Sequence, residues 1–349
     1  MIKVTREELL GCTQEILIVL GESKRGAETA AESMIFSDSR GISTHGTYLL
    51  SPIVNRAKAS QLTLPTNVKI ILDDAAIAEI DGGDGLGAIA GKAAADLSIK
   101  QASKYGISLV LIRNTNNLGA LAYYTEIVAK RGMIALMSCN AAPAMAPWGG
   151  AEAFLGTNPF AIAIFTGKDM LFSADMATSI VARGKIRKAA REGQSIPENW
   201  ALDLDGNITT DPATALKGAL LPMGGPKGSA IAFAIDILSG ILSGSEHAPN
   251  IKSFHALEGV TGVGASLIAI DIRKFMPLDA FTVSMDDYFS KIKGLKKASF
   301  TSEIYLPGEI EYKKEMESKE KGISLDEKTA QSINEMLVQF GIKRNLISI

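Results

Sequence analysis

The sequence predicts an α/β fold in which helices cover a sheet, and three observations support this prediction. Short apolar runs typical of strands alternate with helical segments along most of the chain. The 349 residues are enough to bury a large core, either in one large domain or in two closely joined ones. Hydrophobic residues make up 46% of the chain and charged residues 21%, as is usual for a soluble globular protein.

The N-terminal part of the chain predicts three helices. The first begins after Thr5, because Thr5 can cap the helix while Glu8 reaches back to it. The apolar face of this helix is formed by Leu9, Leu10, Ile16, Leu17 and Leu20. A second amphipathic helix is expected over 26–39 and a third over about 47–60, ending before Pro65.

The rest of the chain is predicted to alternate strands and helices. Helices are expected at 88–104, 120–131 and 228–243. The charged segment 181–222 is rich in loop residues and is expected to form a helical excursion, and the tail 308–342 mixes both charges evenly, as a solvated helix does. The expected strands are 68–72, 77–81, 108–114, 134–140, 161–165 and 267–272.

Composition also excludes several classes of function. A net charge of −2 provides no basic surface, so nucleic acid and anionic membranes are not expected as partners. No apolar run approaches about 18 residues, and the acidic residues near the start argue against a signal peptide. Cys12 and Cys139 are isolated, which favours a reducing compartment. We therefore expect a soluble, cytoplasmic protein.

Common catalytic motifs are missing from the sequence. There is no HExxH motif, and three scattered histidines with two single cysteines do not form a zinc site, so no metal is expected. The GxSxG motif of serine hydrolases is also absent. Any acid–base chemistry near neutral pH that needs an imidazole must therefore use His45, His247 or His255.

Two glycine-rich stretches raise the question of phosphate binding. In "IDGGDGLGAIAGKAAA" (80–95) the glycine spacing is loose, and the next strand ends at Arg113-Asn114 without the acidic residue expected for a ribose, which favours a tight turn. In "LPMGGPKGSAIAFAIDIL" (221–238), Gly224 and Gly225 free the backbone and Lys227 adds a charge just before a helix. On these residues alone, an anion site and a simple helix start remain equally good interpretations.

Five longer segments, in this order, resemble the malate/L-lactate dehydrogenase family, which also contains ureidoglycolate, sulfolactate and diketogulonate enzymes and cyclic-imine reductases. The resemblance covers nearly the whole chain. The segments are "SRGISTHG" (39–46), "APWGGAEAFLGTNPFAIAI" (146–164), "DMATSIVARGKI" (175–186), "DLDGNITTDPATALKGALLPMGGPKGSA" (203–230) and "IYLPGEIEY" (304–312).

The resemblance implies a fold, a cofactor and an assembly. The implied fold is a non-Rossmann α/β fold with a mixed sheet, in a homodimer. A nicotinamide cofactor, NAD or NADP, would transfer hydride to a 2-oxo acid or a C=N group. Residues 76–264 would form the cofactor-binding part, and residues 1–75 with 265–349 a helical, dimerisation and substrate-side part. The implied cofactor-binding residues are Thr157, Asn158, Pro159, Asp175, Met176, Ala177, Lys227, Pro307, Gly308 and Glu309.

The resemblance also implies a role for His45, which stands beside the reacting carbon in the family and is a candidate proton donor. A positioned acid near neutral pKa assists hydride delivery to a carbonyl, because that step creates an alkoxide. His247 and His255 match no catalytic segment and are expected to be structural or surface residues.

The chain departs from the family pattern on the substrate side. Leu49 stands where the family has an arginine that clamps a carboxylate, and leucine cannot replace its bidentate hydrogen bonds. Asn117 stands where a second histidine is expected, and asparagine carries no proton at neutral pH. Ala141 and Ala142 replace hydroxyl residues, and Gly264-Ala265 replaces a Gly-His pair.

Three hypotheses follow from these departures. The first is a reductase with an altered substrate, such as an imine or a less anionic carbonyl, whose pocket is formed by His45, Asn117, Thr44, Tyr48, Leu49 and Ala141. The second is a dinucleotide-binding protein that has lost turnover and serves as a sensor or structural partner. The third is an ordinary 2-hydroxy-acid dehydrogenase in which Arg113 or another cation replaces the clamp. The first is favoured because His45 and the cofactor segments survive together.

Overall fold

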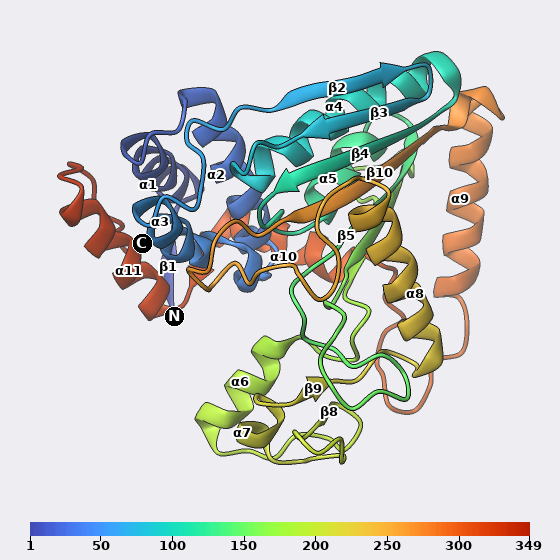
Figure 1. The fold of residues 1–349 in the computed structure, drawn as a ribbon. Helices are drawn as coiled ribbons and strands as arrows, with labels where there is room; N and C mark the ends of the chain where they lie inside the picture. The colour runs from blue at the N-terminus through green and yellow to red at the C-terminus, as the bar shows by residue number, and fades with distance from the viewer.

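The computed structural model describes all 349 residues and is built around a seven-stranded sheet (Figure 1). The strand order is β2-β3-β4-β10-β5-β6-β7. Only β3 and β4 run parallel, and every other neighbouring pair is antiparallel. This confirms a mixed sheet that differs from the mostly parallel Rossmann sheet. The strands are β2 Lys69–Asp74, β3 Ile77–Asp81, β4 Ile107–Thr115, β5 Met133–Cys139, β6 Phe160–Ile164, β7 Phe172–Met176 and β10 Val263–Asp271.

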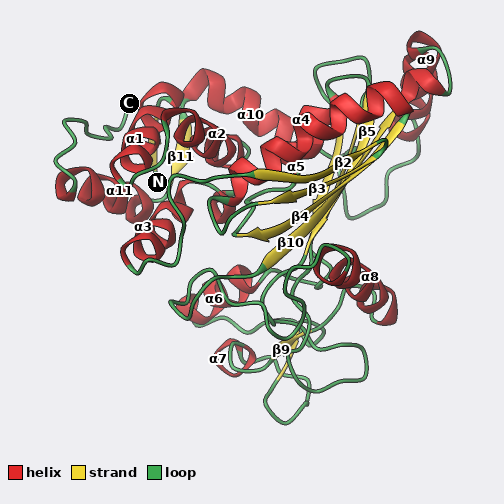
Figure 2. Ribbon diagram, turned by 45° about the horizontal axis from the view of Figure 1, so that its top comes forward, coloured by secondary structure: helices red, strands yellow, loops and turns green.

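Helices cover both faces of this sheet, as Figure 2 shows. On one face, α4 (Gly87–Tyr105) packs on β4 and β10, and α5 (Ala122–Ala129) packs on β5 and β6. On the other face lies α8 (Pro226–Asp236), which continues as a π-helical turn, Ile237–Ile241, against β10. The main core forms between the sheet and the layer of α4 and α5, because alternate side chains of β4 point into it.

The two ends of the chain meet in a helical layer beside the sheet (Figure 1). A short antiparallel ribbon joins β1 (Ile2–Val4) to β11 (Ile323–Leu325), and α11 buries Ile333 and Leu337 in a second core. The tail is therefore two helices separated by a strand, and the expected single solvated helix is wrong. The helices of this layer are α1 Arg6–Val19, α2 Lys24–Ser39, α3 Leu50–Lys58, α10 Glu309–Lys321 and α11 Glu327–Gln339.

A separate lobe and a projecting helix complete the fold. The lobe confirms the expected excursion and has a small core of its own. At the far end of the sheet, α9 (Leu278–Lys293) has no buried side chain. No helix in the structure has the length and apolar character needed to cross a membrane. The lobe contains α6 Arg183–Glu192, β8 Ala201–Leu202, α7 Pro212–Ala215 and β9 Ala219–Leu220.

Local details differ from the sequence predictions in instructive ways. Thr5 caps α1 as expected, accepting from the N–H of Glu8 at 3.1 Å, but the Glu8 carboxylate bonds the Thr5 hydroxyl, at 3.0 Å, in place of its backbone N–H. The helix expected over 47–60 becomes α-helical only at Leu50, after two 3-10 turns. The boundary expected at 264/265 falls inside β10, in the middle of the sheet. The division into two functional parts stays a prediction.

Candidate active site

The loop that carries His45 is fixed by a buried carboxylate. His45 ends the 3-10 turn Ser43–His45, between α2 and α3. The Asp38 side chain at the end of α2 accepts from the N–H and the hydroxyl of Thr47, at 2.8 and 2.7 Å. Any Cβ on Gly46 would overlap the Asp38 carboxylate, so this position requires glycine. Burial raises the pKa of Asp38 to about 7, although both hydrogen bonds from Thr47 lower it.

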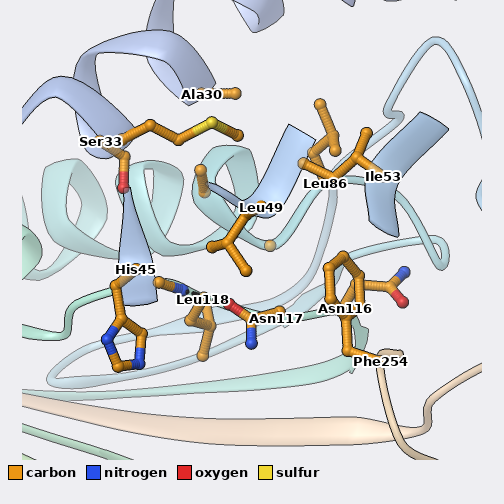
Figure 3. A pocket seen from close by; sticks show the side chains of 14 residues that line it. Ala30, Ser33, His45, Leu49, Ile53, Leu86, Asn116, Asn117, Leu118 and Phe254 are labelled. Atoms are coloured by element: carbon orange, nitrogen blue, oxygen red, sulfur yellow. Dashed lines mark hydrogen bonds between the residues drawn. The ribbon is translucent and has the colours of Figure 1, made fainter. Parts of the chain in front are cut away.

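His45 is one of the residues that line a small, mostly apolar cavity between α2, α3 and the loop after β4 (Figure 3). Its volume is about 20 Å³, the space of about one water molecule. Apart from His45, no side chain that lines it is ionisable. The lining residues are Ala30, Ser33, Met34, His45, Leu49, Ile53, Leu86, Gly87, Ala88, Asn116, Asn117, Leu118, Gly119 and Phe254.

The His45 ring is suited to proton transfer. Its Nδ1 lies 3.1 Å from the Thr44 hydroxyl, and Nε2 has no partner within the chain. The ring is partly exposed at the cavity yet surrounded by protein, and this desolvation lowers its pKa below the usual 6.5. An imidazole with a lowered pKa gives up its proton readily.

Asn117 reaches the cavity from the loop that follows β4. Its Oδ1 accepts from the N–H of Gly119 at 2.8 Å, which leaves the amide NH₂ without a partner in the chain. The neighbouring Asn116 is buried and donates to the carbonyls of Asp84 and Gly85, at 2.9 and 3.0 Å. These bonds hold the first glycine-rich stretch as a tight turn into α4, the interpretation that its spacing favoured.

The structure brings His45, Leu49 and Asn117 to one cavity, but three other predicted substrate-side residues lie outside its lining. Thr44 is exposed beside His45. Tyr48 is also exposed, and its ring centroid lies 6.1 Å from that of His255. The N–H of Ala141 donates to Oδ1 of Asn158 at 3.1 Å, on the side of the predicted cofactor segments.

Arg113 does not replace the missing arginine. On β4, it pairs with Asp81 at 3.2 Å and with Glu79 at 3.5 Å, both on β3, and it does not line the cavity. The hypothesis of an ordinary 2-hydroxy-acid dehydrogenase therefore loses Arg113 as a replacement for the carboxylate clamp. The sequence gives no sign of this pairing, because it joins Arg113 to residues of an adjacent strand.

Sequence reasoning missed Phe254, which closes the cavity from a distant loop. Arg56, fully buried on α3, holds this loop by donating to the carbonyls of Ala256 and Gly259, at 2.7 and 2.6 Å. Arg56 itself was the signal that could have found this loop. It stands three residues after Ile53 on an apolar helix face, and a buried arginine needs hydrogen-bond acceptors from elsewhere in the chain.

The four predicted cofactor segments lie side by side. The N–H of Thr178 donates to the carbonyl of Thr157 at 2.9 Å, and the N–H of Met223 donates to the carbonyl of Thr178 at 2.8 Å. On the other side of β7, the N–H of Ser173 donates to the carbonyl of Pro307 at 3.2 Å. Backbone pairing therefore joins segments that are far apart in the sequence.

Two of the predicted cofactor residues face inward. Asn158 is fully buried, with its NH₂ group donating to the carbonyl of Ala232 on α8 at 2.9 Å, and Pro159 accepts from the N–H of Cys139 at 3.2 Å. Thr157 is partly buried and supplies the carbonyl that holds Thr178. These residues hold the segment in place through hydrogen bonds within the protein.

Asp175 stands at the start of α5. Its carboxylate accepts from the N–H of Ala122, the first residue of that helix, at 2.9 Å. Asp175 lies at the surface, but the protein around its carboxylate removes much of its hydration. This desolvation raises the pKa of Asp175 to about 6, although the hydrogen bond from Ala122 lowers it. Next to it, Met176 is 42% exposed and Ala177 is partly exposed, so the surface remains open.

Lys227 and the segment 307–309 complete this surface. Lys227 is exposed near the start of α8 without an ion-pair partner, after Gly224 and Gly225, whose φ angles are 59° and 62°. Gly308 packs against Ser173 with a φ of 87°.

Glu309, in contrast, is fully engaged within the protein. It accepts from Lys293 at 2.5 Å and from Lys313 at 2.8 Å. Although burial opposes the effect, these two lysines hold the pKa of Glu309 at about 2. Glu309 therefore anchors its segment and is not free to bind another group.

Comparisons with known proteins agree with this architecture. The family model described as malate/L-lactate dehydrogenase matches residues 4–334. The L-sulfolactate dehydrogenase of Methanocaldococcus jannaschii is 38% identical over 94% of both chains, and its structure superposes with a TM-score of 0.92 over 98% of both chains. The malate dehydrogenase of Pyrococcus horikoshii is 35% identical over 98% of this chain and 96% of its own.

A third relative extends the likeness beyond hydroxy-acid enzymes. The structure of a delta1-piperideine-2-carboxylate reductase from Pseudomonas syringae pvar. tomato is 26% identical, with a TM-score of 0.88 over 96% of this chain and all of its own. Both sequence and structure thus match over almost the whole length. The chain belongs to the malate/L-lactate dehydrogenase family of oxidoreductases.

Proposed function

We propose that the protein is an NAD(P)H-dependent reductase that transfers hydride to the carbon of a C=O or C=N group, with His45 donating the proton. The observation that carries this proposal is that His45 is the single ionisable side chain lining the cavity. The relatives support the reaction class, because their names describe dehydrogenases and a reductase.

The residues of the cofactor surface fit a dinucleotide. Lys227 is a free cation beside two glycines at a helix start, an arrangement that suits a phosphate. The bound nicotinamide would supply the hydride. A 2′-phosphate, which NADP has and NAD lacks, would need a cation near this surface. Arg183 already donates to the carbonyl of Leu216 at 3.0 Å, whereas Lys185 is exposed and without a partner.

His45 would supply the proton that completes the reaction. Protonated His45 would donate from Nε2 to the oxygen of the former C=O group or to the nitrogen of the former C=N group, since Nδ1 is held by Thr44. Such a donor typically accelerates a reaction by about 10²–10⁴-fold. The neutral ring would accept the proton when the reaction runs toward oxidation. Asn117 can donate a hydrogen bond to the reacting oxygen or nitrogen but cannot transfer a proton.

The substrate side indicates an altered specificity. Leu49 is only 6% exposed and lines the cavity with Met34 and Ile53. A carboxylate placed against these side chains would lose its hydration without gaining a charged partner, which is unfavourable. The group of the substrate that faces Leu49 is therefore apolar or neutral.

One further feature supports a homodimer, and another supports a location in the cytoplasm. The projecting α9 region leaves Phe275 and Val283 exposed at 76% and 69%, and the π-helical turn leaves Ile237 and Ile241 exposed at 51% and 57%. Large apolar side chains exposed at the surface are typical of protein interfaces, and a second copy of the chain would cover them. Cytoplasmic location is consistent with two cysteines that are free and buried.

The test is a fluorescence titration of the purified protein with NADH and then NADPH, followed by a panel of keto acids, cyclic imines and neutral carbonyls. We expect micromolar binding of one cofactor and oxidation of it by at least one compound. Binding without turnover on the whole panel would favour a dinucleotide-binding protein that is not an enzyme. Failure to bind either cofactor would reject the proposal.

A further inference from the structure

The cavity raises the question of what binds an anionic substrate. The names of the relatives describe enzymes that act on acids, yet neither lysine nor arginine lines this cavity. Arg113 is paired with two carboxylates on β3, and Lys227 belongs to the cofactor surface. A carboxylate bound next to His45 must therefore find its partner at the rim of the cavity.

One basic helix borders this rim. The N-terminal turn of α6 lies against the His45 loop, since a Cβ on Gly184 would lie 3.7 Å from Cγ2 of Thr44, an ordinary van der Waals contact. Figure 2 shows α6 in the lobe below the sheet, near the end of β10. The helix carries five basic residues and one acidic residue, Glu192, so its field is strongly positive.

Arg187 is the arginine of α6 that is free to bind an anion at this rim. It stands three positions after Gly184 and hence on the same face of the helix, toward Thr44. It is exposed and has no hydrogen-bond or ion-pair partner, whereas Arg183 donates to backbone carbonyls and Lys188 pairs with Glu192 at 3.8 Å. Burial lowers the pKa of His255, which follows Phe254, and the positive charge of Arg187 lowers it further.

We infer that Arg187 binds the carboxylate of the substrate, and that the substrate is a 2-oxo or cyclic-imino monocarboxylate with an apolar substituent. The carboxylate would face α6, and the apolar substituent would face Leu49, on the side where the family places its arginine. The clamp that is missing at Leu49 would thus be replaced by a cation from the lobe. This inference rests on the proposed function, because it names the substrate class of the same site.

The test compares Arg187→Gln with Arg191→Gln, a matched control one turn and about 6 Å farther along α6. Two measurements are made on each protein with NADH or NADPH bound. The first is the KM for 2-oxobutanoate and 3-methyl-2-oxobutanoate and for their methyl esters. The second is the Kd for oxamate, which carries a carboxylate, and for neutral oxamide, from cofactor fluorescence.

We expect Arg187→Gln to raise the KM and the Kd for the acids about 10- to 100-fold, because a charged hydrogen bond is lost. The esters, oxamide, cofactor affinity and the Arg191→Gln variant should be unaffected. Equal effects on acids and esters, or no effect in an active enzyme, would overturn the inference and leave the proposed function standing. If the wild type binds oxamate through Arg187 but reduces no compound, the inference stands and the proposed function fails. If wild-type protein binds neither oxamate nor substrate, both are wrong.

Discussion

Asp38 accepts two hydrogen bonds from Thr47, at 2.8 Å from its N–H and 2.7 Å from its hydroxyl, and thereby spans the loop that carries His45. The carboxylate fills the space beside Gly46, the residue that directly follows His45. The orientation of His45 therefore depends on a buried acid that does not line the cavity.

A side chain at position 46 should disturb this arrangement. We expect Gly46→Ala to destabilise the fold by about 1–3 kcal/mol, because its Cβ would overlap the Asp38 carboxylate. Turnover should fall while cofactor affinity is retained. Urea denaturation and a cofactor titration measure the two effects.

Gly184→Ala provides the matched control for this substitution. A Cβ at this position meets only Thr44, at 3.7 Å, within the first turn of α6. Alanine there should be neutral or stabilising by up to about 1 kcal/mol, because helix propensity improves. Equal stability of Gly46→Ala and wild type would show that the loop tolerates a shift of Asp38.

The raised pKa of Asp38 predicts a pH dependence of stability. Its pKa is about 7 in the folded protein and near 3.8 in an unfolded chain, so the folded state binds more protons between these values. This group therefore favours folding at low pH, and its contribution to stability declines as the pH rises from about 4 to 7.

Asp38→Asn removes this titration while its amide oxygen still accepts from Thr47. The loss of stability between pH 5 and pH 8, measured by urea unfolding, should be smaller in the variant than in the wild type. An equal loss in both proteins would mean that Asp38 is ionised in the folded protein throughout this range.

Substitution can restore the family residues at two of the substrate-side positions that depart from the pattern. Leu49→Arg alone should destabilise the protein, because it places a charge among Met34 and Ile53. Combined with Asn117→His, it should create or strongly increase the reduction of oxaloacetate, measured as kcat/KM with NADH or NADPH. A folded double variant without any gain would show that these two positions do not determine substrate choice.

Arg113 should have no part in binding the substrate, because it is held by Asp81 and Glu79. Arg113→Gln should leave the KM for every active substrate within about twofold and cost at most about 1 kcal/mol of stability, as expected for a partly exposed ion pair. A selective rise in the KM for acids would restore the hypothesis of an ordinary 2-hydroxy-acid dehydrogenase.

The elements predicted well from the sequence are those with strong periodicity. The strand expected at 77–81 has those bounds, and the helix expected at 88–104 differs by one residue at each end. In contrast, β7 was missed because its five residues alternate weakly at the edge of the sheet, and α9 was missed because none of its side chains enters a core. The π-helical turn after Asp236 has no known sequence signal.

The site was predicted only as far as local sequence carries information. His45, Leu49 and Asn117 were identified by resemblance, and the structure places them around one cavity. The contribution of Phe254 depends on long-range bonds from Arg56, and the proximity of α6 to Thr44 depends on how the lobe folds back. Neither relation is encoded by spacing along the chain.

The measurement that tests the central claim most directly is the rate of NADH or NADPH oxidation by wild type and His45→Ala, from pH 5 to 9, with cofactor Kd measured on both. The wild-type rate of reduction should fall as pH rises through the lowered pKa of His45, because only the protonated ring donates. His45→Ala should lose about 10²–10⁴-fold in rate at unchanged cofactor affinity. An undiminished rate in His45→Ala would contradict the account.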